Sequence, residues 1–131
     1  MGYYSQFNYE IVEPCIVDKE KLEEFEKFFS NGKNGDLYGF YGVKLHIDEN
    51  NASLLNIELE DYYNKFYDDK LFAVKLSLIL KSGNIRLEFT GEDMDKWAYS
   101  VSPDKVEELF PLWITYDEFE TIAKVFPFLK K

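Results

Sequence analysis

The 131-residue sequence has few of the residues that most often carry chemistry, with one cysteine and one histidine. The single cysteine, Cys15, cannot form a disulfide within the chain. Cys15 and His46 together cannot supply the four ligands of a structural zinc site. The chain therefore has to fold without disulfides or structural zinc, and we expect neither a metal site nor a cofactor.

Long apolar runs are also lacking. No stretch approaches the roughly 20 consecutive apolar residues that a membrane-spanning helix requires. Residues 1–6 have neither a basic start nor an apolar core, so we expect no secretory signal. These features favour a cytoplasmic location.

Basic residues are outnumbered, with 15 Lys and Arg against 25 Asp and Glu and a formal net charge of −10. Binding to phosphate backbones relies on Lys and Arg, so we do not expect direct nucleic-acid binding. An acidic surface favours basic proteins or cations as partners. Alternatively, the charge only keeps an aromatic-rich chain soluble. No linker or repeat divides the sequence, which indicates a single domain over residues 1–131.

Alternating apolar and polar residues predict an N-terminal strand and two hairpins. The first strand ends at Glu13-Pro14, because proline disrupts the preceding backbone. Matching the apolar faces places Ile47 opposite Leu55 in the first hairpin and Phe89 near Trp97 in the second. The five strands cover residues 3–12, 43–47, 55–59, 85–89 and 97–101.

Helical spacing of apolar residues predicts helices over residues 19–29 and 70–81. Asp18 is the expected N-cap of the first, and Asp68 or Asp69 that of the second. The second is apolar over more than half its circumference, so we expect it to be central, ending at Ser82-Gly83.

Two further segments complete the chain. Residues 103–110 fit either a short helix after Ser102 or a strand after a turn, and the Glu107-Glu108 pair slightly favours the helix. A capping box at Thr115 opens a last helix that ends near Pro127. The pattern as a whole predicts an α+β fold, an antiparallel sheet of about five strands packed mainly on one face against two to four helices.

Catalytic signals are weak. We expect His46 to point outward on its strand, without a serine or cysteine beside it, and Cys15 to be a buried, inert thiol. Carboxylate pairs are numerous in a chain with 25 acids, so they arise by coincidence. We therefore expect no catalytic residues and no enzyme activity.

Aromatic residues are abundant, with 12 Phe, 10 Tyr and 2 Trp. Tyrosine and tryptophan are favoured at protein interfaces, because one end of the side chain is apolar and the other forms hydrogen bonds. Alternatively, these residues fill the core. Many lie in expected loops or at strand ends: Tyr3, Tyr4, Tyr38, Phe40, Tyr41, Tyr62, Tyr63, Phe66 and Tyr67.

The segment FTGEDMDKWAY over residues 89–99, followed by Val106-Glu107-Glu108-Leu109, resembles a group of small uncharacterised proteins of bacteria and their phages. The opening Met1-Gly2-Tyr3-Tyr4 is similar to the start of many short phage and mobile-element proteins. The resemblance implies no catalytic residues. It does imply a role in the takeover of a host, as in acidic proteins resembling DNA mimics and anti-CRISPR inhibitors, whose carboxylates replace phosphates on a basic groove.

The leading hypothesis is a non-enzymatic acidic protein that binds a basic protein surface, such as that of a nuclease or another nucleic-acid-binding protein. The alternatives are a structural or oligomerising module and, less favoured, a small carboxylate-dependent hydrolase. The residues expected to contact the partner are Glu58, Glu60, Asp61, Tyr62, Tyr63, Glu92, Asp93 and Asp95.

Overall fold

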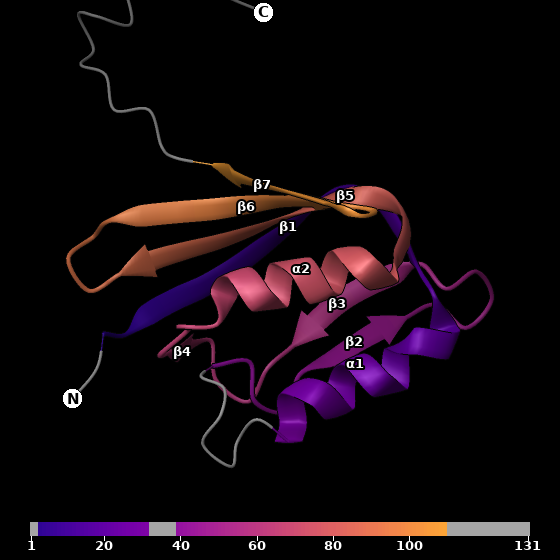
Figure 1. Ribbon diagram of the computed structural model, residues 1–131, viewed down its shortest axis with the longest axis horizontal. Helices are drawn as coiled ribbons and strands as arrows, with labels where there is room; N and C mark the ends of the chain where they lie inside the picture. Colours follow the sequence, from indigo (N-terminus) through magenta and orange to yellow (C-terminus); the bar gives the residue numbers. More distant parts are fainter. Residues whose placement is uncertain (1–2, 32–38, 110–131) are drawn as a thin grey trace, which may run out of the picture.

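The structure is a computed structural model that describes residues 3–31 and 39–109 (Figure 1). The expected C-terminal helix from Thr115 and the loop residue Tyr38 lie outside these ranges. The elements are, in order, β1 (Ser5–Val17), α1 (Lys19–Asn31), β2 (Lys44–Ile47), β3 (Leu54–Glu58), β4 (Tyr63–Asn64), α2 (Asp69–Ile79), β5 (Leu80–Gly91), β6 (Lys96–Ser102) and β7 (Lys105–Leu109).

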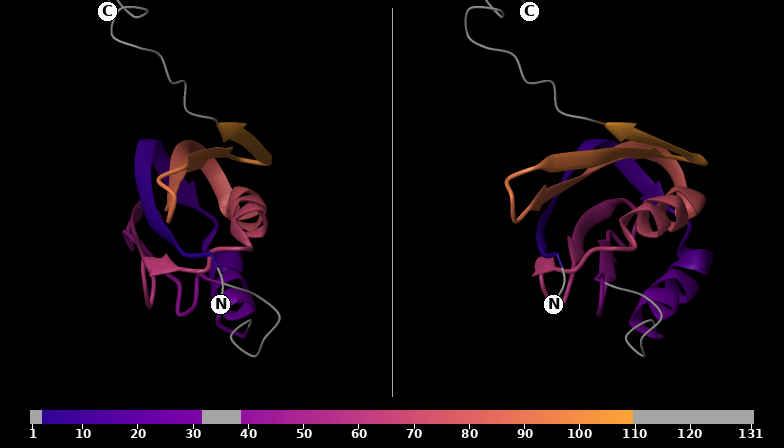
Figure 2. Two further views of the ribbon diagram at one scale, coloured as in Figure 1. Left: turned by 90° about the vertical axis from the view of Figure 1, so that its left-hand side faces the viewer. Right: turned by 60° about the vertical axis from the view of Figure 1, so that its left-hand side comes forward.

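The described residues form an α+β fold, which confirms the expected class. A five-stranded antiparallel sheet has the order β4-β1-β5-β6-β7, and β2 and β3 form a separate two-stranded sheet. Helix α2 packs against the inner face of the large sheet and also contacts α1, which in turn contacts β2. Figure 2 shows that the large sheet curves over α2. The helix packs on this sheet and against α1, as its apolar sequence predicted, but Val74 and Leu78 of that apolar set are exposed.

The membership of the large sheet differs from the expectation in one respect. Only the second hairpin, β5–β6, belongs to it, and the first hairpin, β2–β3, does not. Strand β1 pairs with β5 along one edge. Along its other edge, the N-terminal end of β1 pairs with the short β4, so this part of the edge is not open to the first hairpin. The remaining position is taken by β7.

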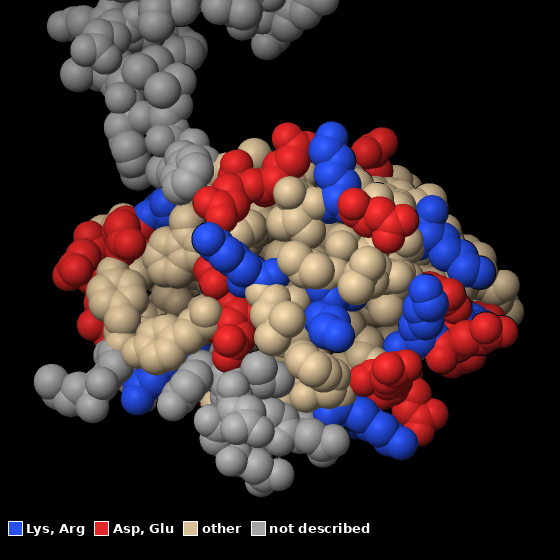
Figure 3. Space-filling model, viewed as in Figure 1, with Lys and Arg blue, Asp and Glu red and all other residues tan. Residues whose placement is uncertain are grey.

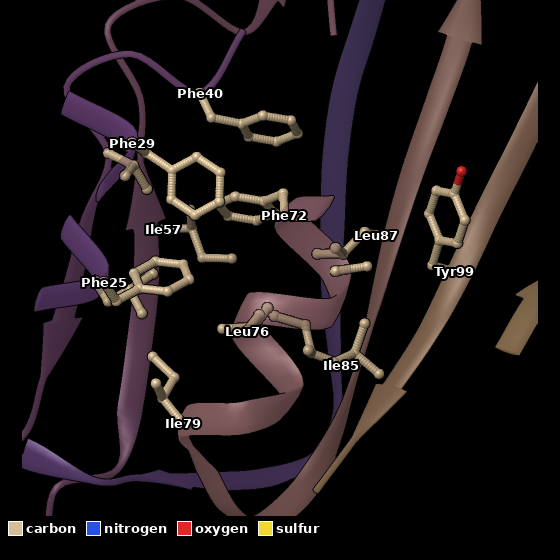
Figure 4. Close-up of a cluster of buried hydrophobic side chains, with 14 of the residues drawn as sticks. Phe25, Phe29, Phe40, Ile57, Phe72, Leu76, Ile79, Ile85, Leu87 and Tyr99 are labelled. Carbon is tan, nitrogen blue, oxygen red and sulfur yellow. The ribbon is translucent and has the colours of Figure 1, made fainter. Parts of the chain in front are cut away.

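The core contains a cluster of packed aromatic rings among aliphatic side chains (Figure 4). The rings of Phe40 and Phe72 stack with centroids 4.0 Å apart, and the ring of Phe29 meets Phe72 edge-on at 5.1 Å. Phe7 on β1 and Phe89 on β5 continue this cluster onto the sheet, with ring centroids 5.3 Å apart. The buried aromatic residues therefore join α1, α2 and the large sheet into one core.

Strand β1 continues through Pro14, so the expected break at Glu13-Pro14 is wrong. The pairing of β1 with β5 shifts register on both sides of this point, which is the signature of a β-bulge. Opposite the bulge, Gly83 has a φ of +98° and lies so close to Pro14 and Cys15 that a Cβ would overlap the β1 backbone. The bulge and the glycine together accommodate the proline.

Helix α2 ends at Ile79, before the expected end at Ser82-Gly83. Leu80 is already extended and pairs with Val17 of β1. The Ile79 carbonyl accepts a hydrogen bond from the backbone N–H of Asp18, at 2.8 Å. Tertiary pairing and capping thus end the helix before the local signals do.

Residues 105–109 form strand β7, so the helix favoured for residues 103–110 is wrong and the alternative strand is correct. Ser102 pairs with Lys105 across a turn in which Asp104 has a φ of 57°. Val106 then pairs with Val101 on the otherwise open edge of β6. Pairing along this edge outweighs the local helical signals.

The first hairpin confirms most of its expected register, with Leu45 opposite Ile57 and His46 opposite Asn56. A register shift follows His46, and Ile47 pairs with Leu54 instead of Leu55. Leu54 is consequently 3% exposed, whereas Leu55 is 57% exposed.

Two neighbouring leucine substitutions distinguish the observed register from the expected one. Leu54→Ala is expected to lower the free energy of unfolding by about 2–5 kcal/mol, because it leaves a cavity in the core. Leu55→Ala, as the matched control, should change it by no more than about 0.5 kcal/mol. Urea unfolding monitored by tryptophan fluorescence measures both values. The reverse order of the two effects would contradict the observed register.

Candidate functional site

The two expected partner-binding segments meet at the N-terminal end of β1. Ser5 pairs with Asn64 of β4 on one side and with Gly91 of β5 on the other. Residues 61–63 therefore approach this end from one side, and the loop that follows Gly91 approaches it from the other. We call residues 92–95 the acidic loop.

Tyr3 attaches the acidic loop to the rest of the chain. Its hydroxyl donates a hydrogen bond to Asp95 Oδ1 and accepts one from the backbone N–H of Asp93, at 3.1 Å. The hydrogen bond to Asp95 raises the pKa of the Tyr3 hydroxyl above its usual value. The backbone N–H of Tyr3 also donates to the hydroxyl of Tyr67, at 2.6 Å. Tyr3 therefore connects the acidic loop to the segment that follows β4.

Tyr4 makes a second connection between the two segments. Its backbone N–H donates to Glu92 Oε1, at 2.9 Å. Its ring stacks on the ring of Tyr63 with centroids 5.3 Å apart, and Lys65 Nζ lies 5.6 Å from its centroid. A pair of stacked tyrosine rings thus lies beside the acidic loop.

The acidic loop is itself a closed turn. The backbone N–H of Gly91 donates to the Asp95 carbonyl at 2.8 Å, and that of Met94 donates to the Gly91 carbonyl at 3.0 Å. A Cβ on Gly91 would overlap the Tyr3 hydroxyl and Asp95 Oδ1, so a larger residue there would displace these two side chains. The Asp93 carboxylate forms no hydrogen bond or ion pair with another described residue, and Met94 is 71% exposed at the tip. The turn therefore holds an exposed carboxylate on a fixed backbone.

The residues expected at the end of β3 and in the segment after it have differing roles. The Glu58 carboxylate lies 2.7 Å from His46 Nε2 on the outer face of the β2–β3 hairpin. The expected outward orientation of His46 agrees with this contact. Asp61 Oδ1 accepts a hydrogen bond from the Tyr63 backbone at 2.9 Å. The Tyr62 hydroxyl donates to the Ile57 carbonyl at 2.9 Å, so Tyr62 fastens the connection even though its ring is partly exposed. Glu60 is exposed in the same connection.

The structure therefore brings together Tyr63 and the three acids of the loop, and it places Glu58 on the other sheet. Sequence reasoning counted Tyr3 and Tyr4 among the loop aromatics but did not identify them as the residues that hold the site. Their position at the start of the expected N-terminal strand was the available signal. Two other residues of that aromatic set, Phe40 and Phe66, are buried in the core instead.

The carboxylates of the acidic loop differ from many others in the molecule. Over the described residues, none of the three forms a salt bridge with a lysine or arginine. Elsewhere, basic side chains pair with Glu10, Glu23, Glu49, Glu88, Glu107 and Glu108. Figure 3 shows charges of both signs interleaved over most of this face. At the end near the β5–β6 turn, acidic side chains lie beside uncharged ones, with a basic side chain close by.

The described residues also contain the one thiol of the chain and hollows in the surface. Cys15 is fully buried, as expected, and burial raises the pKa of its thiol. One hollow on the outer face of the large sheet, of about 380 Å³, places Glu88 beside Arg86 and so does not isolate a pair of carboxylates. In residues 3–31 and 39–109, no group of three or more His, Cys, Asp and Glu side chains is arranged to hold a metal ion. Nor is any helix of these residues long and apolar enough to cross a membrane.

A partly buried polar cluster fastens the start of α2 to β6. Asp69 Oδ2 accepts hydrogen bonds from Trp97 Nε1 and from the Tyr99 hydroxyl, each at 2.8 Å. Burial, and secondly the hydrogen bond to Asp69, raises the pKa of Tyr99 well above its ordinary value of 10.0. All the polar atoms involved have partners, so we assign this cluster a structural role.

Comparisons of the chain with protein-family models, with curated proteins and with solved structures find no match.

Removing the Tyr3 hydroxyl tests how the acidic loop is held. In Tyr3→Phe, the Asp93 amide is expected to exchange with solvent faster by about tenfold, because it loses its acceptor. The Met94 amide, which donates to the Gly91 carbonyl within the turn, serves as the internal control and should change little. Hydrogen exchange followed by NMR gives both rates. Equal protection of the Asp93 amide in both proteins would show that Tyr3 does not hold the loop.

The raised pKa of Tyr99 predicts a loss of stability at high pH. An unfolded tyrosine ionises near pH 10 while folded Tyr99 stays neutral, so this contribution is complete below pH 10 and falls as the pH rises. The slope is at most about 1.4 kcal/mol per pH unit. We expect Tyr99→Phe to flatten the decline measured by urea unfolding between about pH 9 and pH 11. Parallel curves for the two proteins would contradict the assignment.

Proposed function

We propose that this protein is a non-enzymatic binding protein that presents the acidic loop to a basic surface of another protein. One observation carries the proposal: Glu92, Asp93 and Asp95 lie on a turn held by Tyr3 and Tyr4. A turn ordered in advance loses little conformational entropy on binding, so its charges contribute more of their interaction energy to affinity.

The chemistry of this end of the molecule suits lysine- and arginine-rich surfaces. Carboxylates without a basic partner in the described chain are available to cations from outside. Tyrosine faces also attract cations, as the position of Lys65 near the ring of Tyr4 illustrates. Tyr63, 48% exposed and stacked on Tyr4, offers such a contact to a partner. The acids supply long-range attraction and the rings supply apolar contact area.

A nucleic-acid-binding groove is the partner surface that this combination fits best. Such grooves carry lysine and arginine to neutralise phosphates, and carboxylates at a protein surface can take the place of those phosphates. The resemblance of residues 89–99 to small phage and bacterial proteins supports the same interpretation, because this segment contains the whole acidic loop. The proposed role is that of an inhibitor or DNA mimic encoded by a phage or mobile element.

A second candidate function is self-assembly. Strands β4 and β7 are the two edges of the large sheet, and an edge strand offers unpaired backbone groups to another chain. Sedimentation separates the two candidates, because a stable oligomer that persists on dilution favours assembly, whereas a monomer favours the binding role.

Charge reversal at Asp93 tests the binding role. Affinity capture from a bacterial lysate at about 50 mM salt, followed by mass spectrometry, identifies the bound protein. Its affinity is then measured directly with the purified pair. Asp93→Lys is expected to weaken that affinity by about tenfold or more, because it replaces attraction by repulsion without removing a hydrogen bond of the turn. Raising the salt to about 500 mM should weaken wild-type binding as well.

Glu49→Lys is the matched control, since it changes the net charge equally at a 91%-exposed side chain outside this site. Equal effects of the two substitutions would indicate that net charge, and not the acidic loop, determines binding. Affinity that is indifferent to both Asp93→Lys and salt would refute the proposal.

A further inference from the structure

Met94, at the tip of the acidic loop, combines an exposed apolar side chain with an unfavourable backbone conformation. Its side chain is 71% exposed, the highest value among the large apolar side chains in the part of the chain that the structure describes. Its φ is 65°, in the left-handed region that residues with a Cβ disfavour. Neither burial nor backbone preference therefore favours a methionine at this position.

Three other described residues with side chains have a positive φ, and each has a reason within the chain. Phe40 is buried and stacks on Phe72, so core packing offsets the cost of its conformation. Ala52 is also buried, and its N–H and carbonyl both form backbone hydrogen bonds. Asp104 lies in the turn between β6 and β7, and a short polar side chain adopts this conformation more readily than a long apolar one. The exposure of Met94 leaves it without a comparable reason.

The turn itself accounts for the backbone conformation at position 94 but not for the residue. The backbone N–H of Met94 donates to the Gly91 carbonyl, and that of Gly91 donates to the Asp95 carbonyl. Short hairpin loops of this kind commonly have a type I turn followed by one left-handed residue, for which glycine is preferred. A glycine at position 94 would fit the same turn with less strain. That methionine stands there instead indicates a role for its side chain outside the turn.

The surroundings of Met94 indicate the kind of surface that its side chain suits. Asp93 precedes it on the turn, and Tyr3 joins the turn to Tyr67, which like Tyr63 is about half exposed. Methionine and tyrosine are enriched in the buried centre of protein interfaces, whereas charged side chains lie at the rim. Figure 1 shows that the β5–β6 turn projects at one end of the large sheet, so its tip is accessible to another molecule. A complementary surface has an apolar depression for the tip and basic side chains around it.

We propose that Met94 is the apolar anchor of the acidic loop, and that it enters an apolar pocket within the basic surface of the partner protein. This inference rests on the proposed function and adds to it a residue that determines specificity. The carboxylates supply an attraction that salt weakens, whereas the burial of a methionine side chain depends little on salt. A basic surface without a pocket gains only the first contribution, so Met94 discriminates between basic surfaces.

Substitutions at position 94 test the anchor, and the probe is the partner captured from the bacterial lysate and then purified. Met94→Gly is expected to weaken the affinity by about tenfold or more, at about 50 mM and at about 500 mM salt alike, because it removes the anchor and no charge. Met94→Asn should weaken it similarly, since asparagine tolerates the left-handed backbone without the freedom of glycine. Met94→Leu should stay within about threefold of the wild type, because leucine has a similar volume. Leu55→Ala, which removes an exposed apolar side chain from β3, is the matched control and should leave the affinity unchanged.

Urea unfolding of the same variants separates a lost contact from a damaged fold. Met94→Gly is expected to unfold at the wild-type urea concentration or above it, because glycine relieves the left-handed backbone. A lower midpoint would overturn the proposal, since Met94 would then pack within its own chain. Wild-type affinity in Met94→Gly, with weakened binding in Asp93→Lys, would overturn the anchor and leave the proposed function intact. Wild-type affinity in both variants, or the capture of no protein through the acidic loop, would overturn both.

Discussion

The pairing of β1 with β5 is the interaction on which the rest of the structure depends. It runs from Ser5 opposite Gly91 to Val17 opposite Leu80. At one end, this pairing brings the residues before β1 next to the acidic loop. At the other end, it terminates α2 beside the start of α1. It survives Pro14 because a bulge and Gly83 allow two backbones to approach closely. The core and the candidate site are both positioned by this one ladder.

The acidic loop and the exposed apolar side chains of α1 and α2 (Phe28, Val74 and Leu78) both follow from this arrangement. Strand β1 lies between β4 and β5, so two loops that are distant in the sequence meet where β1 begins. Helix α2 lies beneath the sheet and beside α1, so one stripe of its side chains is buried and another faces outward. The first surface combines acids with tyrosine rings, and the second combines apolar side chains with charged side chains of both signs. Surfaces so different in chemistry suit different contacts.

Much of the fold could be predicted because local patterns and tertiary contacts agree there. In the second hairpin, around Leu87 and Tyr99, the predicted side-chain orientation and strand register were both correct. Apolar and polar residues alternate strictly along its two strands, and this alternation fixes the register. The helix that contains Phe25 and the central helix that contains Phe72 were also correct. The errors arose where a long-range partner outweighed a local signal, as at Pro14 and Val106. A lone sequence does not reveal which strand edge is open.

For the site, composition established an acidic, aromatic-rich chain with one histidine and one cysteine, and the spacing of apolar residues established its α+β class. The sequence by itself also placed Glu92, Asp93 and Asp95 among the residues expected to contact a partner. Only the tertiary structure decided that Tyr3 and Tyr4 hold this loop and that Tyr63 lies beside it. The physical reason is range: side-chain periodicity is a property of neighbouring residues, whereas these contacts join residues about 60 to 90 positions apart, which only the folded ladder brings together.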